Sequence, residues 1–314
     1  MNLNYQKAAH MAGFAHLVYQ DKDTISKQLQ DLGFTDWAWF DNDGTQAFAC
    51  RKHKANEIFI VFRGTEPTEM KDLMADAKAW RKKAREKGLV HFGFAQAIDK
   101  VYDKIVQWIS EQKLDDGYKI TCTGHSLGAA LATIMASRLD AHELYTFGSP
   151  RVGNRAFVKE MGNDGIKHWR FVNNNDIVTK VPFPLIYRHH GQLVYINHHG
   201  NIRKMTPWQR FKDRWRGRAR AIAKGQLFDG IFDHSMDLYY KNYNMSIHRA
   251  RSSCPLCSYE EEIWFLRGKV EPIDLVECSQ CSYHYEPHQF VSSFLDLYQN
   301  STITSNYVSM TSTL

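Results

Sequence analysis

One serine in this sequence lies in a pattern that is typical of nucleophilic catalysis. Residues 124–128 read Gly-His-Ser-Leu-Gly, and they fall where an apolar stretch predicted as a strand passes into a small-residue stretch predicted as a helix. A sharp turn of this kind leaves no room for Cβ atoms, so the two glycines predict a strained, exposed Ser126. Taken alone, the pattern also fits an ordinary turn with a solvated serine, so the rest of the chain decides.

A serine hydroxyl is a poor nucleophile unless an imidazole accepts its proton and a carboxylate orients that imidazole. The expected order along the chain is serine, then acid, then histidine. Asp176 lies in a polar loop just after a predicted strand, and His234 lies on a later loop before a predicted helix. Chain order alone leaves the histidine open, because His189, His190, His198 and His199 are among the others that also follow Asp176.

The elements that must position these side chains alternate between about residues 14 and 244. Apolar strands are predicted over 57–62, 118–123, 143–147 and 168–172, and helices over 94–111 and 127–139. This alternation indicates an α/β fold with a mostly parallel central sheet flanked by helices. Because the carboxyl ends of parallel strands meet at one edge of a sheet, we expect Ser126 and Asp176 to lie there together.

Six motifs then occur in a fixed order, and together they identify a family resemblance. They are Ile-Val-Phe-Arg-Gly-Thr-Glu at 60–66, Val-His-Phe-Gly-Phe at 90–94, Thr-Gly-His-Ser-Leu-Gly-Ala at 123–129, Thr-Phe-Gly-Ser-Pro-Arg-Val-Gly at 146–153, Val-Asn-Asn-Asn-Asp-Ile-Val at 172–178 and Asp-His-Ser at 233–235. The chain resembles the class 3 lipases of the α/β-hydrolase superfamily, which hydrolyse acyl esters. The resemblance implies that Ser126 is the nucleophile, Asp176 the acid and His234 the base, with no cofactor needed for catalysis.

The tetrahedral intermediate of such a reaction carries an oxyanion, which positioned N–H donors must stabilise. The resemblance assigns one donor to Thr65, the residue after Arg-Gly, and its hydroxyl could assist. The N–H of Leu127 is expected to be the second donor, because it follows the nucleophile at a helix N-terminus. Without the other motifs, residues 63–65 would be taken for an ordinary turn at the end of a strand.

Two amphipathic stretches bear on contact with lipid. Residues 67–80 resemble the family's lid, with apolar side chains on one helical face, although a helix packed permanently on the core has the same periodicity. Residues 206–225 predict a helix that begins with a capping box formed by Thr206 and Gln209. Its aromatic face, flanked by basic residues, would suit anionic headgroups. For this helix we favour the alternative, in which the aromatic side chains pack on the hydrolase body and the arginines are solvated.

Four cysteines near the C-terminus predict a metal site. Cys254 and Cys257 form one CxxC pair, Cys278 and Cys281 form another, and twenty residues separate the pairs. Thiolates at this spacing are typical of a closed, tetrahedral structural zinc site. The alternative is four free or disulfide-linked thiols. Residues 246–290 are locally acidic, so protein docking or capping of the domain is favoured over nucleic-acid binding.

The composition of the 314-residue chain, 43% hydrophobic and 24% charged, excludes disordered, collagen-like and coiled-coil proteins. We expect an α/β-hydrolase catalytic domain over 1–245, a zinc-ribbon-like module over 246–290 and a flexible Ser- and Thr-rich tail over 291–314. No signal-peptide pattern opens the sequence, so a cytoplasmic location is expected, with signal-less export as the alternative. No nucleic-acid partner is expected, and the oligomeric state stays open.

These observations predict a serine hydrolase that cleaves carboxylic esters of lipids, similar to a triacylglycerol lipase, through an acyl-enzyme. A phospholipase of A type or a soluble short-chain esterase would use the same three residues. A rival of another class is a zinc-stapled adaptor that binds membrane or protein without turnover. The presence of Ser126, Asp176, His234 and both oxyanion candidates argues against that adaptor.

Overall fold

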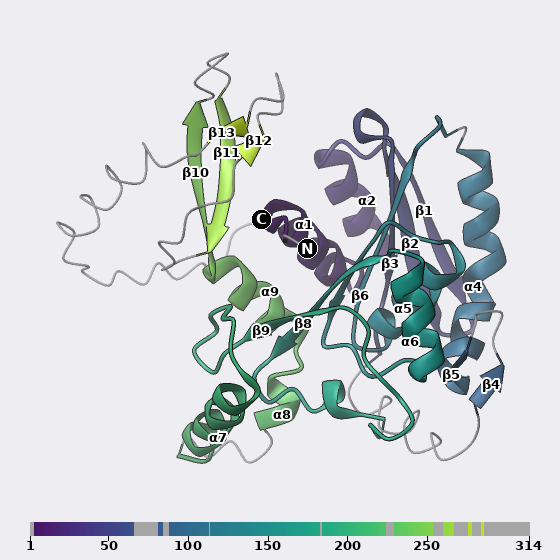
Figure 1. Cartoon of the computed structure of the whole chain (residues 1–314). Helices are drawn as coiled ribbons and strands as arrows, with labels where there is room; N and C mark the ends of the chain where they lie inside the picture. The colour runs from purple at the N-terminus through teal and green to yellow at the C-terminus, as the bar shows by residue number, and fades with distance from the viewer. Residues whose placement is uncertain are drawn as a thin grey trace. The chain divides into compact units, whose positions relative to one another are not determined.

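The computed structural model describes residues 3–65, 81–83, 88–112, 114–182, 184–223, 229–253, 260–266, 276–277 and 284–285. The chain divides into two compact units, Met1–Ser246 and Ile247–Leu314 (Figure 1). The smaller unit contains two antiparallel strand pairs. In one, β10 (Ile247–Ser253) pairs with β11 (Glu260–Leu266), and in the other, β12 (Val276–Glu277) pairs with β13 (His284–Tyr285).

A seven-stranded sheet with the order β1-β2-β3-β6-β7-β8-β9 forms the centre of the larger unit. The last five strands of this order run parallel, and β1 and β2 are antiparallel additions at one edge. The predicted α/β class and mostly parallel sheet are therefore confirmed. The strands are β1 (Asp36–Asn42), β2 (Thr45–Lys52), β3 (Glu57–Phe62), β6 (Lys119–His125), β7 (Glu143–Phe147), β8 (Lys167–Asn173) and β9 (Gln192–Ile196). A separate short pair joins β4 (Arg81–Lys83) to β5 (Leu89–His91).

Helices cover both faces of the sheet (Figure 1). On one face α1 packs against α9, and on the other α4 packs against α5. The helices are α1 (Tyr5–Leu17), α2 (Lys22–Asp31), α4 (Phe92–Glu111), α5 (Leu127–Arg138), α6 (Arg155–Asn163), α7 (Pro207–Ala223), α8 (Asp229–Phe232) and α9 (Met236–Met245), with short 3-10 turns η1 (His53–Ala55) and η3 (Val178–Lys180).

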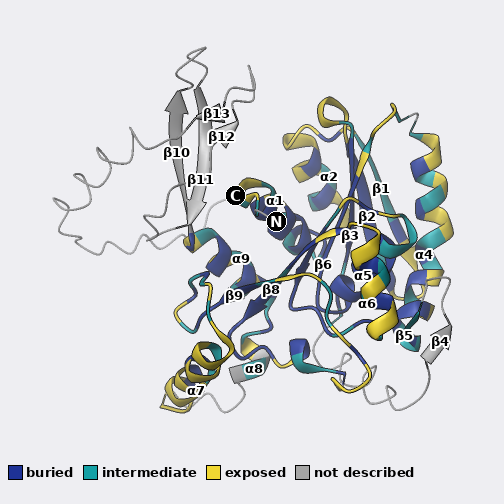
Figure 2. Ribbon diagram, in the orientation of Figure 1, coloured by how far each residue is buried: buried dark blue, intermediate teal, exposed yellow. Residues whose placement is uncertain are grey.

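Strand β3 shows why the sheet needs helices on both sides, since all six of its residues are buried (Figure 2). Ile60 and its same-face neighbours belong to the core cluster that includes the apolar sides of α4 and α5. Phe59 points to the opposite face, where its ring lies 5.6 Å from that of Phe14 in α1. A strand buried on both faces of a sheet reads as a continuous apolar run, which is why it was predictable.

Several predictions lie outside the described residues. These are the lid over 67–80, all four cysteines of the predicted zinc site, and the tail over 291–314. Within the part of the chain that the structure describes, no group of three or more His, Cys, Asp or Glu side chains is arranged to hold a metal ion. Among those same residues, no helix combines the length and the apolarity that crossing a membrane requires.

Candidate active site

The turn at Ser126 joins the end of β6 to the start of α5. Ser126 has φ 59° and ψ −126°, a conformation that is strained for any residue with a Cβ atom. Its N–H donates to the Phe147 carbonyl at 3.0 Å, and its own carbonyl accepts from Ala129 at 3.1 Å. The predicted strain is present, but the predicted exposure is wrong, because Ser126 is completely buried.

Glycines allow three backbone segments to meet around this serine. A Cβ on Gly128 would lie 2.8 Å from the carbonyl carbon of Arg63, so only glycine lets α5 approach the end of β3 so closely. A Cβ on Gly64 would lie 2.5 Å from the His125 carbonyl oxygen and 3.1 Å from Cβ of Ser126. The turn after β3, which carries Thr65, therefore lies directly beside the turn that carries the serine.

The structure brings the three predicted residues Ser126, His234 and Asp176 into one hydrogen-bonded row. Nε2 of His234 lies 2.7 Å from Oγ of Ser126, and Nδ1 lies 3.0 Å from each carboxylate oxygen of Asp176. The exposed fractions of all three residues are 1% or less. A proton on Nδ1 facing the carboxylate leaves Nε2 free to accept the serine proton, which is the arrangement that base-assisted attack requires.

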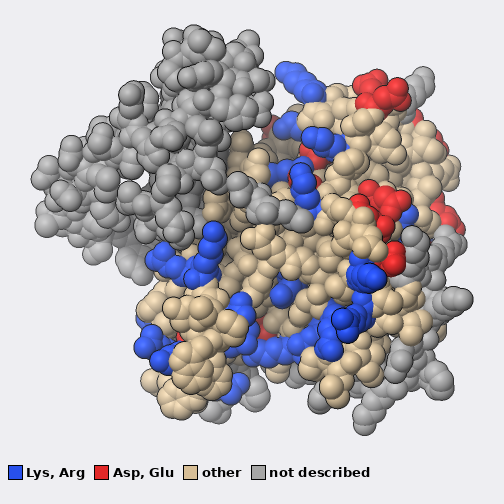
Figure 3. Space-filling view, in the orientation of Figure 1, with Lys and Arg blue, Asp and Glu red and all other residues tan. Residues whose placement is uncertain are grey.

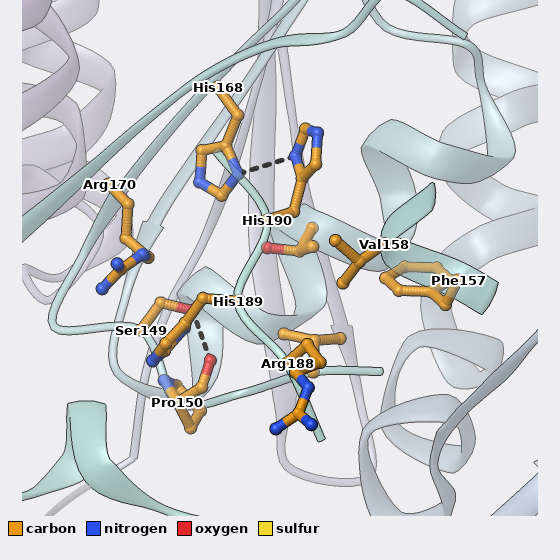
Figure 4. Close-up of a pocket in the computed structure, with 11 residues that line it drawn as sticks. Ser149, Pro150, Phe157, Val158, His168, Arg170, Arg188, His189 and His190 are labelled. Atoms are coloured by element: carbon orange, nitrogen blue, oxygen red, sulfur yellow. Dashed lines mark hydrogen bonds between the residues drawn. The ribbon is translucent and has the colours of Figure 1, made fainter. Parts of the chain in front are cut away.

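The four competing histidines are held elsewhere. His189 donates to the Thr179 carbonyl at 2.8 Å, and burial lowers its pKa to about 3. His190 faces His168 with 3.2 Å between their Nδ1 atoms, at a cavity of about 10 Å³ that has room for about one water molecule (Figure 4). His198 contacts Asp213 at 2.5 Å, and His199 lies 3.4 Å from a guanidinium nitrogen of Arg220.

Two buried groups that were not predicted hold the Asp176 carboxylate in place. The hydroxyl of Tyr239 in α9 donates to Oδ2 of Asp176 at 2.6 Å, and the N–H of Val178 donates to Oδ1 at 2.9 Å. The same tyrosine oxygen accepts from the Asn173 N–H at 2.8 Å. Burial and the neighbouring carboxylate raise the pKa of Tyr239 well above its usual value, so this hydroxyl stays protonated and can donate.

His125, another residue that was not predicted, supports the loop that carries His234. Its Nε2 lies 2.6 Å from the carbonyl oxygen of His234, so that nitrogen carries the proton. Its Nδ1 then accepts from the Tyr19 hydroxyl at 2.9 Å. Burial and the nearby His234 ring lower the pKa of His125 well below its usual value. A neutral ring is therefore favoured here, with the tautomer that both contacts require.

Gly148 leaves room for the side chains of Asp176 and His234. It follows β7 with φ +60°, and a Cβ there would lie 2.9 Å from Oδ2 of Asp176 and 3.0 Å from Nδ1 of His234. The sequence offered a signal for this position, since Gly148 directly follows a predicted parallel strand whose carboxyl end points to the site.

Both oxyanion candidates lie at the turn. Leu127 is the first residue of α5, where a backbone N–H has no partner within the helix. Thr65 follows Gly64, and its hydroxyl oxygen is buried without a hydrogen-bond partner among the described residues. An unpaired buried hydroxyl costs stability, so its position beside Ser126 favours a role with a bound substrate.

The larger unit matches known lipases in sequence and in structure. Residues 59–185 match the sequence model of the family Lipase (class 3), a span that includes Ser126 and Asp176 but ends before His234. A lipase of Rhizomucor miehei is 35% identical over 150 residues, which cover 44% of this chain and 41% of that protein. The chain thus spans about two fifths of the length of this curated relative.

Two crystal structures show the same fold. A lipase of Rhizopus microsporus var. chinensis superimposes with a TM-score of 0.52 at 27% identity, covering 61% of this chain and 74% of that one. A mono- and diacylglycerol lipase of Aspergillus oryzae superimposes with a TM-score of 0.59 at 23% identity, covering 78% and 99%, and its likeness concerns the fold alone. The chain is therefore similar to class 3 lipases over residues 59–185, and the two crystal structures support the same fold for the larger unit.

Proposed function

We propose that this protein is a serine hydrolase that cleaves carboxylic ester bonds of lipids. The observation that carries the proposal is the continuous row from Oγ of Ser126 through the His234 imidazole to the Asp176 carboxylate, with contacts of 2.7 and 3.0 Å. The row is buried, and in surroundings of low dielectric such hydrogen bonds are stronger than in water. The lipases that the chain resembles support the same reaction class.

In the first half of the reaction, Oγ of Ser126 attacks the acyl carbonyl carbon while Nε2 of His234 takes the hydroxyl proton. The carbonyl π electrons move to oxygen, and the resulting oxyanion accepts hydrogen bonds from the N–H of Leu127 and from Thr65. When this intermediate collapses, the bond to the alcohol oxygen breaks, and His234 gives its proton to that oxygen. Asp176 keeps the imidazolium oriented and offsets its charge throughout.

In the second half, water takes the place that the alcohol has left. His234 removes a proton from this water as its oxygen attacks the acyl-enzyme carbonyl. The same oxyanion donors stabilise the second tetrahedral intermediate. Its collapse releases the fatty acid, and the proton on His234 returns to Oγ of Ser126, which restores the starting state.

Acylglycerols are the substrate class that we propose, because sequence relatives named as lipases, including a secreted mono- and diacylglycerol lipase of Penicillium cyclopium that is 30% identical over 167 residues, support this class. A phospholipase of A type and a soluble short-chain esterase are the rival substrate assignments. Comparing emulsified long-chain acylglycerol, phospholipid vesicles and a soluble chromogenic butyrate ester separates the three. Turnover that rises sharply with emulsified acylglycerol supports the proposal, and turnover confined to the soluble ester contradicts it.

The enzyme assignment itself is tested by Ser126→Ala. This variant should lose about 10⁴-fold or more in kcat on the chromogenic ester. Ser149→Ala is a matched control, because Ser149 is a second buried serine near the end of a parallel strand, and its hydroxyl contacts only the Pro150 carbonyl among the described groups. Equal rates for wild type and Ser126→Ala would instead favour a non-catalytic adaptor.

We also propose one structural zinc ion bound by Cys254, Cys257, Cys278 and Cys281. Support comes from the strand pairing, since each CxxC pair falls in sequence between the two strands of an antiparallel pair, β10 with β11 and β12 with β13. Four thiolates leave no open position, so this ion would take no part in ester cleavage. Metal analysis of the full chain should find about one zinc per molecule, and much less in a Cys254→Ser, Cys278→Ser variant.

A further inference from the structure

Helix α7 exposes an unusual number of large apolar side chains. Trp208, Phe211, Trp215 and Ile222 are 62%, 56%, 69% and 57% exposed. The prediction that its aromatic side chains pack on the hydrolase body is therefore wrong. Aromatic residues exposed to solvent do not gain the hydrophobic stabilisation that burial would give. A contiguous group of them therefore marks an interaction surface.

The opposite side of α7 explains why the aromatic residues point outward. Asp213, Gly217 and Ala221, at four-residue spacing, are the buried residues of this helix. The Asp213 carboxylate accepts from the Tyr195 hydroxyl at 2.9 Å and from the His198 N–H at 3.1 Å. Gly217 lies against the Asn174 side chain, where a Cβ would collide. These contacts hold the Asp213 carboxylate in the interior. They therefore fix the rotation of α7 about its own axis.

This rotation also decides on which side of α7 each charged residue lies. At about 100° per residue, the aromatic stripe lies nearly opposite the buried stripe. Most of the described basic residues fall on the two flanks between them, with Lys212, Arg216 and Arg220 on one flank and Arg214 and Arg218 on the other. The one acidic residue of the helix, Asp213, is the buried anchor. The exposed surface of α7 thus has an aromatic stripe along its outermost line and cationic side chains on both sides of that stripe.

The neighbouring aromatic and basic side chains also contact one another. The rings of Trp208 and Phe211 stack at 5.4 Å, and the Lys212 ammonium lies 5.2 Å from the Trp208 ring centre. In the space-filling view, basic side chains lie around the region of α7, and most of the acidic ones visible in this view lie in the right-hand half of the molecule, away from that helix (Figure 3). The charge of this surface is therefore complementary to an anionic partner.

Helix α7 lies against the loop that carries the proposed acid. The Asn175 side chain donates to the Arg214 carbonyl at 3.0 Å, and the Arg214 guanidinium donates to the Asn174 carbonyl at 3.2 Å. Two more exposed apolar side chains lie next in sequence to site residues, since Ile177 follows Asp176 and Phe232 closely precedes His234. Exposed apolar side chains therefore occur both on α7 and close in sequence to the site residues.

We propose that α7 docks the enzyme onto bilayers that contain anionic phospholipid, with Trp208, Phe211 and Trp215 entering the interface. The flanking basic residues would contact the headgroups, each strengthening binding roughly fivefold near the surface. This binding goes beyond the proposed hydrolysis, because it needs neither the serine nor turnover. A protein partner, duplex nucleic acid and a second copy of the chain are the other occupants that the test must separate.

Vesicle flotation of the full chain tests the proposal. The Ser126→Ala background prevents lipid breakdown, so failure of binding and failure of catalysis stay separate. We expect binding to vesicles of phosphatidylcholine with phosphatidylglycerol, at least tenfold weaker binding to phosphatidylcholine alone, and loss of binding at high salt. Trp215→Ser should weaken binding about fivefold or more, and a Lys212→Glu, Arg216→Glu, Arg218→Glu variant at least tenfold.

Matched controls come from exposed positions far from α7. Leu32→Ser removes a 56% exposed apolar side chain, and Lys22→Glu, Lys27→Glu, Lys104→Glu changes the net charge by the same amount at exposed lysines of α2 and α4. Both controls should bind like the parent. Binding that both α7 variants retain, binding that both controls lose equally, or self-association or DNA binding through α7 without vesicle binding would each overturn the proposal.

Discussion

The hydroxyl of Tyr239 lies 2.6 Å from Oδ2 of Asp176, the same oxygen that lies 3.0 Å from Nδ1 of His234. The carboxylate charge is thus shared between a phenol and an imidazole. We predict that Tyr239→Phe lowers kcat about tenfold while KM changes little, because Asp176 loses a contact that aligns it with His234. Because the remaining carboxylate is less neutralised, it stabilises the imidazolium more, and the acid limb of the kcat/KM profile should move to higher pH.

Tyr243→Phe provides the control for that variant. Tyr243 is also buried in α9, and its hydroxyl donates to the Tyr5 carbonyl at 2.7 Å, away from the site. Each variant removes the hydrogen bond of a buried hydroxyl, which costs about 1 kcal/mol of unfolding free energy or more. Only Tyr239→Phe should shift the pH profile, so identical profiles for the two variants would contradict a positioning role.

The unpaired hydroxyl of Thr65 leads to a second prediction, on the oxyanion. Thr65→Val replaces a buried hydroxyl that has no hydrogen-bond partner among the described residues, so the free energy of unfolding should not fall. If the hydroxyl donates to the oxyanion, kcat should fall about 10- to 100-fold, at or below the usual effect of losing an oxyanion donor. Steady-state kinetics with a soluble ester and urea unfolding together measure both effects.

Thr121→Val is the control, and we expect it to lower stability rather than kcat. Its buried hydroxyl donates to Glu57 at 2.6 Å, on a neighbouring strand and away from the turn. Removing it should cost about 1–3 kcal/mol of unfolding free energy with little change in kcat. A Thr65→Val variant that is destabilised but fully active would show that this hydroxyl is structural and leave the backbone N–H groups as the oxyanion donors.

The parallel part of the sheet and the serine turn could be predicted because their signals are local. The buried strand at 57–62 is one apolar run, and Gly124 and Gly128 bracket the serine at fixed spacing. The hairpin of β1 and β2, which was not predicted, also has a local signal in the sequence. Asp43 and Gly44 form its two-residue turn with φ of 47° and 78°, the conformation for which Asp-Gly is favoured.

Other features depend on contacts between distant parts of the chain. Tyr239 contacts Asp176 across 63 positions, and nothing in a short helix distinguishes a tyrosine that orients a carboxylate from one that fills a core. Periodicity placed the α7 aromatic residues on one face but did not say which face meets the body. Burial of Asp213 decides that question, and its partners Tyr195 and His198 belong to another element.

The space beside the acid and base gives a third prediction, at Gly148. Gly148→Ala would place a methyl group about 3 Å from Asp176 and His234 in a left-handed backbone conformation. The loss of alignment should lower kcat about 10²-fold. Gly165→Ala is the control, because Gly165 has φ +75° and a Cβ there would meet no atom within 4 Å, so only the backbone strain of about 1 kcal/mol remains. Similar activity losses in both variants would contradict the steric explanation.

Buried and half-buried histidines predict how stability depends on pH. Burial lowers the pKa of His91, His125, His168 and His190, and it lowers that of His189 to about 3. In the unfolded chain these groups return to about 6.5. Below that pH the unfolded state binds more protons than the folded state, so the free energy of unfolding is fully present above pH 6.5 and falls as the medium becomes more acidic.

Each such histidine contributes up to about 1.4 kcal/mol per pH unit below 6.5. Urea unfolding at pH 7.5, 6.5 and 5.5 should therefore show a free energy of unfolding that falls more steeply as the pH decreases.

His168→Gln tests one contribution, since its ring is buried between Thr146 and His190. The variant should lose stability at pH 7.5 but show a slope smaller by about one proton near pH 5.5. His53→Gln, at an exposed position, is the control. A parent protein that gains stability on acidification would contradict the buried, neutral state of these rings.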